Sequence, residues 1–165
     1  MIVIVMGVVG AGKTTIGSLL AQELGWTFAD ADDFHPPANV EKIRRGIPLA
    51  DDDRQPWLEG LRTAIIGWIA DGRNVVLACS ALKRRYRQEL KAGPQAAMEV
   101  RFVYLKGSPD LIAGRLRLRA GHFAGEQILA SQIADLEEPE DAITVDVTAN
   151  PQQIVAEICQ KLGLG

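Results

Sequence analysis

Residues 7–14 read Gly7-Val8-Val9-Gly10-Ala11-Gly12-Lys13-Thr14 and fit the phosphate-binding pattern G-x-x-x-x-G-K-[ST] at every fixed position. An apolar run, residues 2–6, precedes this loop and predicts a buried strand, and residues 15–24 predict a helix that ends at Gly25. Glycines let the backbone close around phosphates, and the positive end of the new helix favours negative charge at the same point. The alternative is a glycine-rich turn that binds nothing, which the flanking strand and helix disfavour.

The loop predicts a set of nucleotide contacts. Lys13 can reach the β- and γ-phosphates of ATP and is a catalytic candidate, while the Thr14 hydroxyl can take a place on Mg²⁺. The residues expected to contact the nucleotide here are Gly7, Val8, Val9, Gly10, Ala11, Gly12, Lys13, Thr14 and Thr15.

Length and composition predict one domain over residues 1–165. Hydrophobic residues make up 47% of the 165 residues and charged residues 24%, which is ordinary for a globular protein. The net charge of −3 argues against general affinity for nucleic acid or an anionic membrane, and no apolar run is long enough to span a bilayer. We expect the N-terminus not to be a signal peptide, because its removal would remove the loop.

The two cysteines, Cys79 and Cys159, lie far apart in apolar surroundings and without metal-ligand spacing. They predict core residues rather than a disulfide, and therefore a reduced, cytoplasmic protein.

Strand-like and helix-like segments alternate along the chain and predict an α/β fold with a mostly parallel, five-stranded sheet flanked by helices. A loop is expected at residues 48–53, and Ser80, Ser108 and Asn150 are expected to cap helices. The expected strands are residues 2–6, 26–29, 75–79, 100–105 and 143–147, and the expected helices are residues 15–24, 38–45, 56–70, 82–91, 109–119, a segment that resumes through 136, and a last one from 151.

An acidic cluster, Asp30, Asp32 and Asp33 with His35, follows the second expected strand. In open parallel sheets ligands collect at the carboxyl ends of strands, so this cluster should face the phosphate loop. Phosphoryl transfer to an alcohol needs a carboxylate for the hydroxyl proton, and Mg²⁺ needs oxygen ligands. A solvated acidic turn is the alternative, but beside a phosphate loop the functional interpretation leads, with Asp30 as the metal candidate next to Thr14.

Basic residues supply further candidates. Arg54 is either solvated or a fork for an anionic substrate, and in the basic run at residues 83–87 Lys83 is nearest to a strand end. Arg115 and Arg119 share a helix face and predict the stem of a mobile LID segment at about residues 115–130. An ordinary exposed basic helix is the alternative.

The function class follows from what is present and what is missing. The chain contains no Asn-Lys-x-Asp and no Asp-x-x-Gly, which argues against a switch GTPase. A small-molecule kinase remains.

Beyond the loop, the motifs resemble those of the gluconokinases, small phosphate-loop kinases related to shikimate kinase and the nucleoside monophosphate kinases. The resemblance extends from Gly7 to about Pro139, and the tail after Glu140 has no diagnostic match. It differs from the family at Val8, Val9 and Ala11, where serines are frequent. The motifs that carry it are Asp30-Ala31-Asp32-Asp33-Phe34-His35-Pro36, Asn39-Val40-Glu41-Lys42, Gly46-Ile47-Pro48-Leu49, Asp51-Asp52-Asp53-Arg54-Gln55-Pro56-Trp57-Leu58, Cys79-Ser80-Ala81-Leu82-Lys83 with Tyr86-Arg87, Tyr104-Leu105-Lys106-Gly107, Gly121-His122-Phe123 and Ser131-Gln132.

The resemblance implies ATP- and Mg²⁺-dependent phosphorylation of D-gluconate to 6-phospho-D-gluconate, which feeds the pentose phosphate or Entner–Doudoroff routes. Many family members are homodimers, so a homodimer is one state it implies. By the same resemblance Asp32 is the candidate base, Arg115 lies against adenine, and Arg119 meets phosphate. The residues it implies on the substrate are Asp32, His35, Arg54, Lys83, His122 and Gln132, the last two without a role that spacing explains.

Two other functions stay open. One is a related kinase acting on a different sugar acid, on shikimate or on a nucleotide, which a panel of acceptors separates from a gluconokinase. The other is a regulatory module that binds ATP without transferring its phosphate. The intact acidic cluster argues against this function.

Overall fold

The structure is a computed structural model, and it describes residues 1–120 and 123–164. Five parallel strands form one sheet in the order β2-β3-β1-β4-β5, as the sequence predicts. Their bounds are β1 Ile2–Met6, β2 Thr27–Asp30, β3 Val75–Ala78, β4 Val100–Lys106 and β5 Ile143–Asp146.

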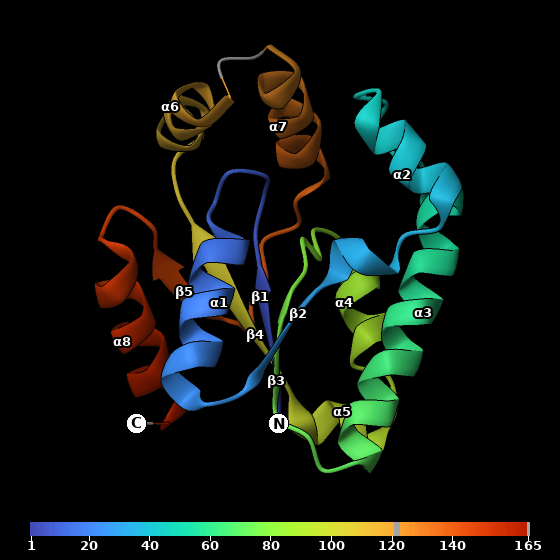
Figure 1. Cartoon of the computed structure of the whole chain (residues 1–165), viewed down its shortest axis with the longest axis vertical. Helices are drawn as coiled ribbons and strands as arrows, with labels where there is room; N and C mark the ends of the chain where they lie inside the picture. Colours follow the sequence, from blue (N-terminus) through green and yellow to red (C-terminus); the bar gives the residue numbers. More distant parts are fainter. Residues whose placement is uncertain (121–122, 165) are drawn as a thin grey trace.

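Helices cover both faces of the sheet (Figure 1). α1 and α8 lie on one face and α3, α4 and α5 on the other, while α6 and α7 stand above the loop that follows β1. The helices are α1 Lys13–Leu24, the 3₁₀ helix η1 Ala31–Phe34, α2 Pro37–Arg44, α3 Asp51–Ala70, α4 Arg84–Leu90, α5 Pro94–Glu99, α6 Pro109–Ala120, α7 Phe123–Asp135 and α8 Pro151–Leu162.

Strand β1 is central and buried at every residue, because it pairs with β3 on one side and β4 on the other. Its side chains alternate between two cores, as the pleat requires. Val3 and Val5 pack toward α1 and α8, whereas Ile2, Ile4 and Met6 pack toward α3 and α4. The loop after β1 therefore starts from the most constrained point of the sheet.

The start of α3 differs from the sequence-based expectation. The helix begins at Asp51 rather than near Pro56, so residues 51–53 are not a loop. The Asp53 carboxylate accepts a hydrogen bond from the backbone N–H of Ala50 at 2.9 Å, which closes the first turn. Three acidic residues also lie in that turn, where the helix dipole favours them. This start places Arg54 on a helix.

The prediction that Ser80 caps a helix is also wrong. Residues 79–83 continue as a loop, and α4 begins at Arg84. Within this loop Ala81 has φ 46°, a left-handed conformation that is uncommon for a residue with a side chain. The caps expected at Ser108 and Asn150 are confirmed, since each side chain accepts a hydrogen bond from the backbone N–H three residues later. Helices η1 and α5 were not predicted.

The remaining observations concern segments outside the sheet. Among the helices of the described residues, none combines the length and apolar character needed to cross a membrane. Both cysteines are buried and free, as expected. His122, a candidate from the sequence, lies outside the described residues, as does its neighbour Gly121.

Candidate active site

The phosphate-binding loop connects β1 to α1 and is shaped by two glycines. Gly10 has φ 81° and Gly12 has φ 100°, a region that residues with side chains rarely adopt. A Cβ atom at Gly10 would lie 2.7 Å from Cγ of Leu116 in α6. Glycine is thus required both by the turn and by the close approach of α6, which brings the basic face of that helix to the loop.

Lys13 is the first residue of α1 and is half-buried beside the acidic cluster. Its Nζ donates a hydrogen bond to the backbone oxygen of Val8, 3.0 Å away. Burial lowers the pKa of Lys13, and the negative charges of Asp32 and Asp30 oppose this shift by favouring the ammonium form. A phosphate group entering the loop would replace water and the Val8 oxygen around this ammonium.

Asp30 ends β2 and points toward α1. Its Oδ1 accepts the backbone N–H of Asp32 at 2.9 Å and caps η1, while its Oδ2 lies 3.4 Å from the Thr14 hydroxyl, which donates to it. Among the described residues no three His, Cys, Asp or Glu side chains gather to hold a metal ion. The oxygens of Thr14 and Asp30 therefore fit a Mg²⁺ whose other ligands are phosphates and water, which is the usual arrangement for this ion.

Asp32 lies in η1 and lines the same cavity as Lys13. Although its side chain is open to solvent, loss of water on the cavity side raises the pKa of its carboxyl, and the charge of Asp30 raises it further. Lys13 acts in the opposite direction. A carboxylate with a raised pKa is a better proton acceptor, which suits the expected general base.

A cavity of about 350 Å³ joins these groups to a second set of side chains. The loop, Lys13, Thr14, Asp30 and Asp32 form one end. His35, Arg54, Trp57, Tyr86 and apolar side chains of residues 43–49 line the other. The structure thus brings together the phosphate loop and most of the residues predicted for an acceptor.

His35 is held by two residues that sequence reasoning did not single out. Its ring stacks on Trp57 with centroids 4.7 Å apart, and its Nδ1 lies 3.2 Å from Nδ2 of Asn39. The same Asn39 nitrogen donates to the backbone oxygen of Asp53 at 2.6 Å. Since Asn39 must present its NH₂ group there, His35 Nδ1 is the acceptor and Nε2 carries the ring proton.

His35 is also biased toward its neutral form. Desolvation lowers the pKa of His35, and the charge of Arg54 lowers it further. A neutral imidazole with a fixed Nε2–H suits donation to a hydroxyl oxygen.

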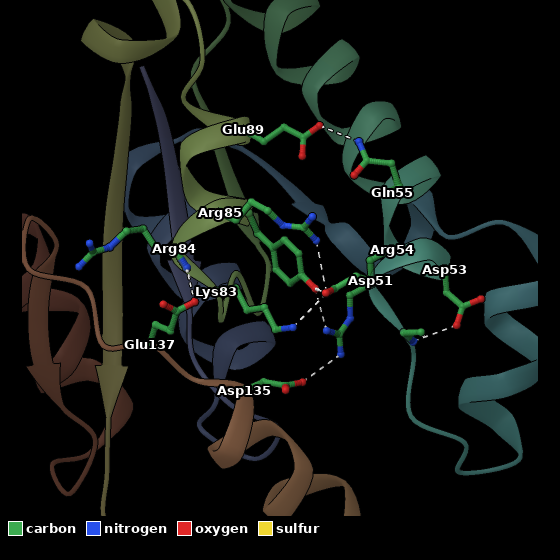
Figure 2. Close-up of polar contacts among 12 residues, drawn as sticks. Asp51, Asp53, Arg54, Gln55, Lys83, Arg84, Arg85, Glu89, Asp135 and Glu137 are labelled. Carbon is green, nitrogen blue, oxygen red and sulfur yellow. Dashed lines mark hydrogen bonds and ion pairs between the residues drawn. The ribbon is translucent and has the colours of Figure 1, made fainter.

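Arg54 lies in the first turn of α3 and reaches two other helices (Figure 2). Its Nη1 donates to the Tyr86 hydroxyl at 2.9 Å, and its Nη2 pairs with Oδ2 of Asp135 at 3.3 Å. Its side chain is 14% exposed. The arginine is held toward the cavity by α4 and by the end of α7.

Lys83 does not line the cavity, in contrast to Arg54. Its Nζ pairs with Asp51 at 3.0 Å, and Asp51 also accepts from the Tyr86 hydroxyl and pairs with Arg85 (Figure 2). These hydrogen bonds lower the pKa of Asp51 to about 2. Lys83 thus lies outside the cavity lining, bound to a carboxylate.

Gln132 of α7 contacts the phosphate loop. Its Oε1 accepts the backbone N–H of Val9 at 2.6 Å, and its side chain lines the cavity. The predicted substrate residue therefore touches the nucleotide side of the site in this structure.

A second cavity of about 380 Å³ lies on the other side of the loop. Arg115 and Arg119 of α6 line it, and Arg119 lines the first cavity too. The Arg115 guanidinium donates to the backbone oxygen of Val147 after β5. The remaining wall comprises Gly10, Ala11, Gly12, Thr15, Ile16, Leu116, Ala149, Pro151 and Ile154. Its position beside the start of α1 suits the rest of a nucleotide.

Sequence reasoning missed Asn39, Trp57, Tyr86 and Asp135 as site residues. Asn39 and Tyr86 stand in motifs that carry the family resemblance, but their contacts depend on residues 14 to 35 positions away. Asp135 meets Arg54 across 81 positions, and nothing in the local pattern signals this.

The chain is similar to known kinases over nearly its whole length. A family model described as an AAA domain matches residues 2–139. A probable gluconokinase from Xenopus tropicalis is 45% identical, over 96% of this chain and 91% of that protein. The crystal structure of a sugar kinase from Janibacter sp. HTCC2649 has a TM-score of 0.88 and 42% identity, covering 99% of this chain and 95% of that chain. A gluconokinase from Sinorhizobium meliloti 1021 has a TM-score of 0.82 and 38% identity, covering 98% and 94%.

Proposed function

The chain belongs to the gluconokinase family, and from this premise we propose that it transfers the γ-phosphate of ATP to a hydroxyl group of D-gluconate, giving 6-phospho-D-gluconate. The observation that carries the proposal is the single cavity that joins Lys13 and the phosphate loop to Asp32, His35 and Arg54. One end suits a polyphosphate and the other a polyhydroxylated anion.

In the proposed reaction the gluconate hydroxyl oxygen attacks the γ-phosphorus as its proton passes to the Asp32 carboxylate. The bond between the γ-phosphorus and the bridging oxygen breaks, and ADP leaves. Lys13 and the N–H groups of the loop hold the phosphates and offset their charge as they separate. Arg115 and Arg119 are proposed to contact adenine and phosphate, respectively.

Mg²⁺ is proposed to be held by Thr14 and Asp30, where it would offset the charge of the bound phosphates. The support is the 3.4 Å contact between their oxygens at the end of the loop.

Arg54 is proposed to bind the gluconate carboxylate, because a guanidinium presents paired donors that match a carboxylate. His35 is proposed to donate Nε2–H to a sugar hydroxyl. Lys83 and His122 stay predictions of the family resemblance, Lys83 because it lies outside the cavity lining.

The proposal extends to assembly and location. A homodimer and a cytoplasmic location are proposed from the family resemblance and, for the location, from two buried free thiols, which suit a reducing compartment. Light scattering on the purified chain tests the dimer.

The reaction is tested by coupling ADP release to a dye in the presence of ATP, Mg²⁺ and gluconate. Gluconate-dependent turnover is expected in the wild type and is expected to fall by about 10³-fold or more in Lys13→Ala and in Asp32→Asn. Full turnover in Asp32→Asn would refute the base, and no gluconate-dependent turnover in the wild type would refute the function.

A further inference from the structure

Helix α7 contacts both ends of the cavity through two side chains, Gln132 and Asp135. They lie three residues apart and therefore share a face of the helix. Gln132 Oε1 accepts the N–H of Val9 at 2.6 Å, and Asp135 Oδ2 accepts from Nη2 of Arg54 at 3.3 Å. One contact is with the phosphate loop and the other with the proposed acceptor-binding arginine.

The contact with Val9 competes with a phosphate. Val9 lies inside the loop whose consecutive N–H groups cradle phosphates in proteins with this motif. An N–H group donates one strong hydrogen bond, so Val9 cannot serve Gln132 and a phosphate oxygen at full strength together. Lys13 is engaged internally as well, by the Val8 oxygen at 3.0 Å. The loop is thus held by internal acceptors that a nucleotide must replace.

The contact with Arg54 competes with an acceptor anion. Asp135 is the carboxylate paired with Arg54 among the described residues, and the pair is only partly exposed, at 14% for Arg54 and 29% for Asp135. A substrate carboxylate that binds Arg54 must share the guanidinium N–H groups with Asp135 or displace Asp135 from them. This step rests on the proposed function, because it assumes an anionic acceptor.

We propose that Gln132 and Asp135 are positioning residues that couple nucleotide binding to acceptor binding through α7. When a phosphate accepts the hydrogen bond of the Val9 N–H, Gln132 is released from the loop. α7 is then held less firmly, so that breaking the Asp135–Arg54 ion pair costs less free energy. Conversely, an acceptor anion that breaks the Asp135–Arg54 pair lowers the free-energy cost of releasing Gln132 from Val9, because coupling between two sites is reciprocal. Each substrate therefore raises the affinity for the other.

The nucleotide half is tested without any acceptor. Titration calorimetry measures the binding of a non-hydrolysable ATP analogue to the wild type, Gln132→Met and Gln132→Ala. Because both substitutions remove an internal competitor worth one hydrogen bond, we expect binding to tighten about threefold or more. The matched control is Gln127→Met, an exposed glutamine on the same helix, which should bind as the wild type does. Unchanged or weaker binding in both Gln132 variants would overturn the proposal.

The coupling itself is tested by repeating the titration with saturating gluconate. The ratio of analogue affinities with and without gluconate should exceed one in the wild type and in Gln127→Met. It should fall toward one in Gln132→Met and in Asp135→Asn, and Asp135→Asn should bind gluconate alone more tightly. A wild-type ratio of one, or an unchanged ratio in both variants, would contradict the coupling.

The two proposals fail separately. If gluconate does not bind the wild type under either condition, the proposed acceptor is wrong, while the analogue titration still decides the role of Gln132.

Discussion

At Asp32, neighbouring charges of opposite sign shift the pKa of the carboxyl in opposite directions. Loss of water on the cavity side and the charge of Asp30 raise its pKa, whereas Lys13 lowers it, and the net shift is upward. For a general base this means that activity is lost on the acid side at a pH above the ordinary aspartate value, when the carboxyl takes a proton.

We therefore predict the effect of Asp30→Asn on the pH dependence of kcat/KM. Removing the Asp30 charge stabilises the ionised form of Asp32, so the acid limb should move to lower pH, even if the maximum rate falls. Asp33→Asn is the matched control, since the Asp33 charge is the weakest of the contributions and its removal should move the limb less. An acid limb that stays in place or moves upward in Asp30→Asn would remove Asp32 from the role of base.

Asn39 is 3% exposed and orients His35, so Asn39→Ala should have two effects. It removes the buried hydrogen bond from the Asn39 side chain to the backbone oxygen of Asp53, which should cost about 0.5–1.5 kcal/mol in the free energy of unfolding. It also frees the His35 tautomer, so KM for gluconate should rise several-fold while KM for ATP stays near the wild-type value. Denaturant unfolding and initial rates measure both effects.

The control for this prediction is Val40→Ala, at the exposed next position on α2. An equal rise of both KM values in Asn39→Ala would indicate a general structural fault rather than the orientation of His35.

Individual residues were predictable where a motif fixes them. Lys13, Thr14, Asp30 and Asp32 follow from patterns whose chemistry is local, and the structure brings these four residues together at one cavity. The role of Lys83 was harder to infer, because its pairing with Asp51 depends on where α3 begins. A motif identifies a residue type, whereas its partner is decided by distant parts of the chain.

At the scale of elements, Arg87 of α4 joins two loops at the edge of the site. It is 7% exposed, and its guanidinium donates to the backbone oxygens of Ala81, Leu82 and Glu137. It thereby fixes the unusual turn after β3 and the chain that follows α7. The burial of this guanidinium lowers the pKa of Arg87, which the nearby Glu137 opposes.

We predict that Arg87→Met destabilises the protein strongly, by about 2–4 kcal/mol in the free energy of unfolding. The reason is that the backbone oxygens of Ala81 and Glu137 lose the donor that Arg87 supplies. The Leu82 oxygen loses one of two donors, since it still accepts the backbone N–H of Glu137.

Arg84→Met is the control, because Arg84 is exposed and, within the described part of the chain, its side chain pairs only with Glu140, at 3.7 Å. Its effect should therefore stay within about 0.5 kcal/mol. Equal effects in urea unfolding would contradict this role for Arg87.

The elements themselves show what patterning can predict. The strands came out at or within two residues of their expected bounds, because buried parallel strands are short apolar runs bounded by turn residues. The start of α3 and the loop after β3 differed from the expected bounds. The hydrogen bond of the Asp53 side chain determines where α3 begins, and the contacts of Arg87 with backbone oxygens determine the loop after β3. Helix ends depend on such individual hydrogen bonds more than on composition.

At the scale of the whole molecule, the central strand organises the chemistry. β1 lies between β3 and β4, and the loop after it borders both cavities. The first cavity is lined mainly by residues after β2 and β3 and the second by α6 and the start of α8, while Gly10, Gly12 and Arg119 line both. Both cavities lie at the carboxyl ends of the strands, where ligands of open α/β sheets bind. α7 stands above the loop after β1 (Figure 1), and its Gln132 contacts Val9 of that loop.

The central claim is that the phosphate leaves ATP for gluconate in this cavity. Its most direct test is one panel of acceptors at equal concentration under identical ATP and Mg²⁺: gluconate, other sugar acids, shikimate and nucleoside monophosphates, with the phosphorylated product identified by phosphorus NMR. The account predicts 6-phospho-D-gluconate as the dominant product and the highest kcat/KM for gluconate. A nucleoside monophosphate or shikimate that outcompetes gluconate would contradict it, as would ATP binding with no phosphorylated product from any acceptor.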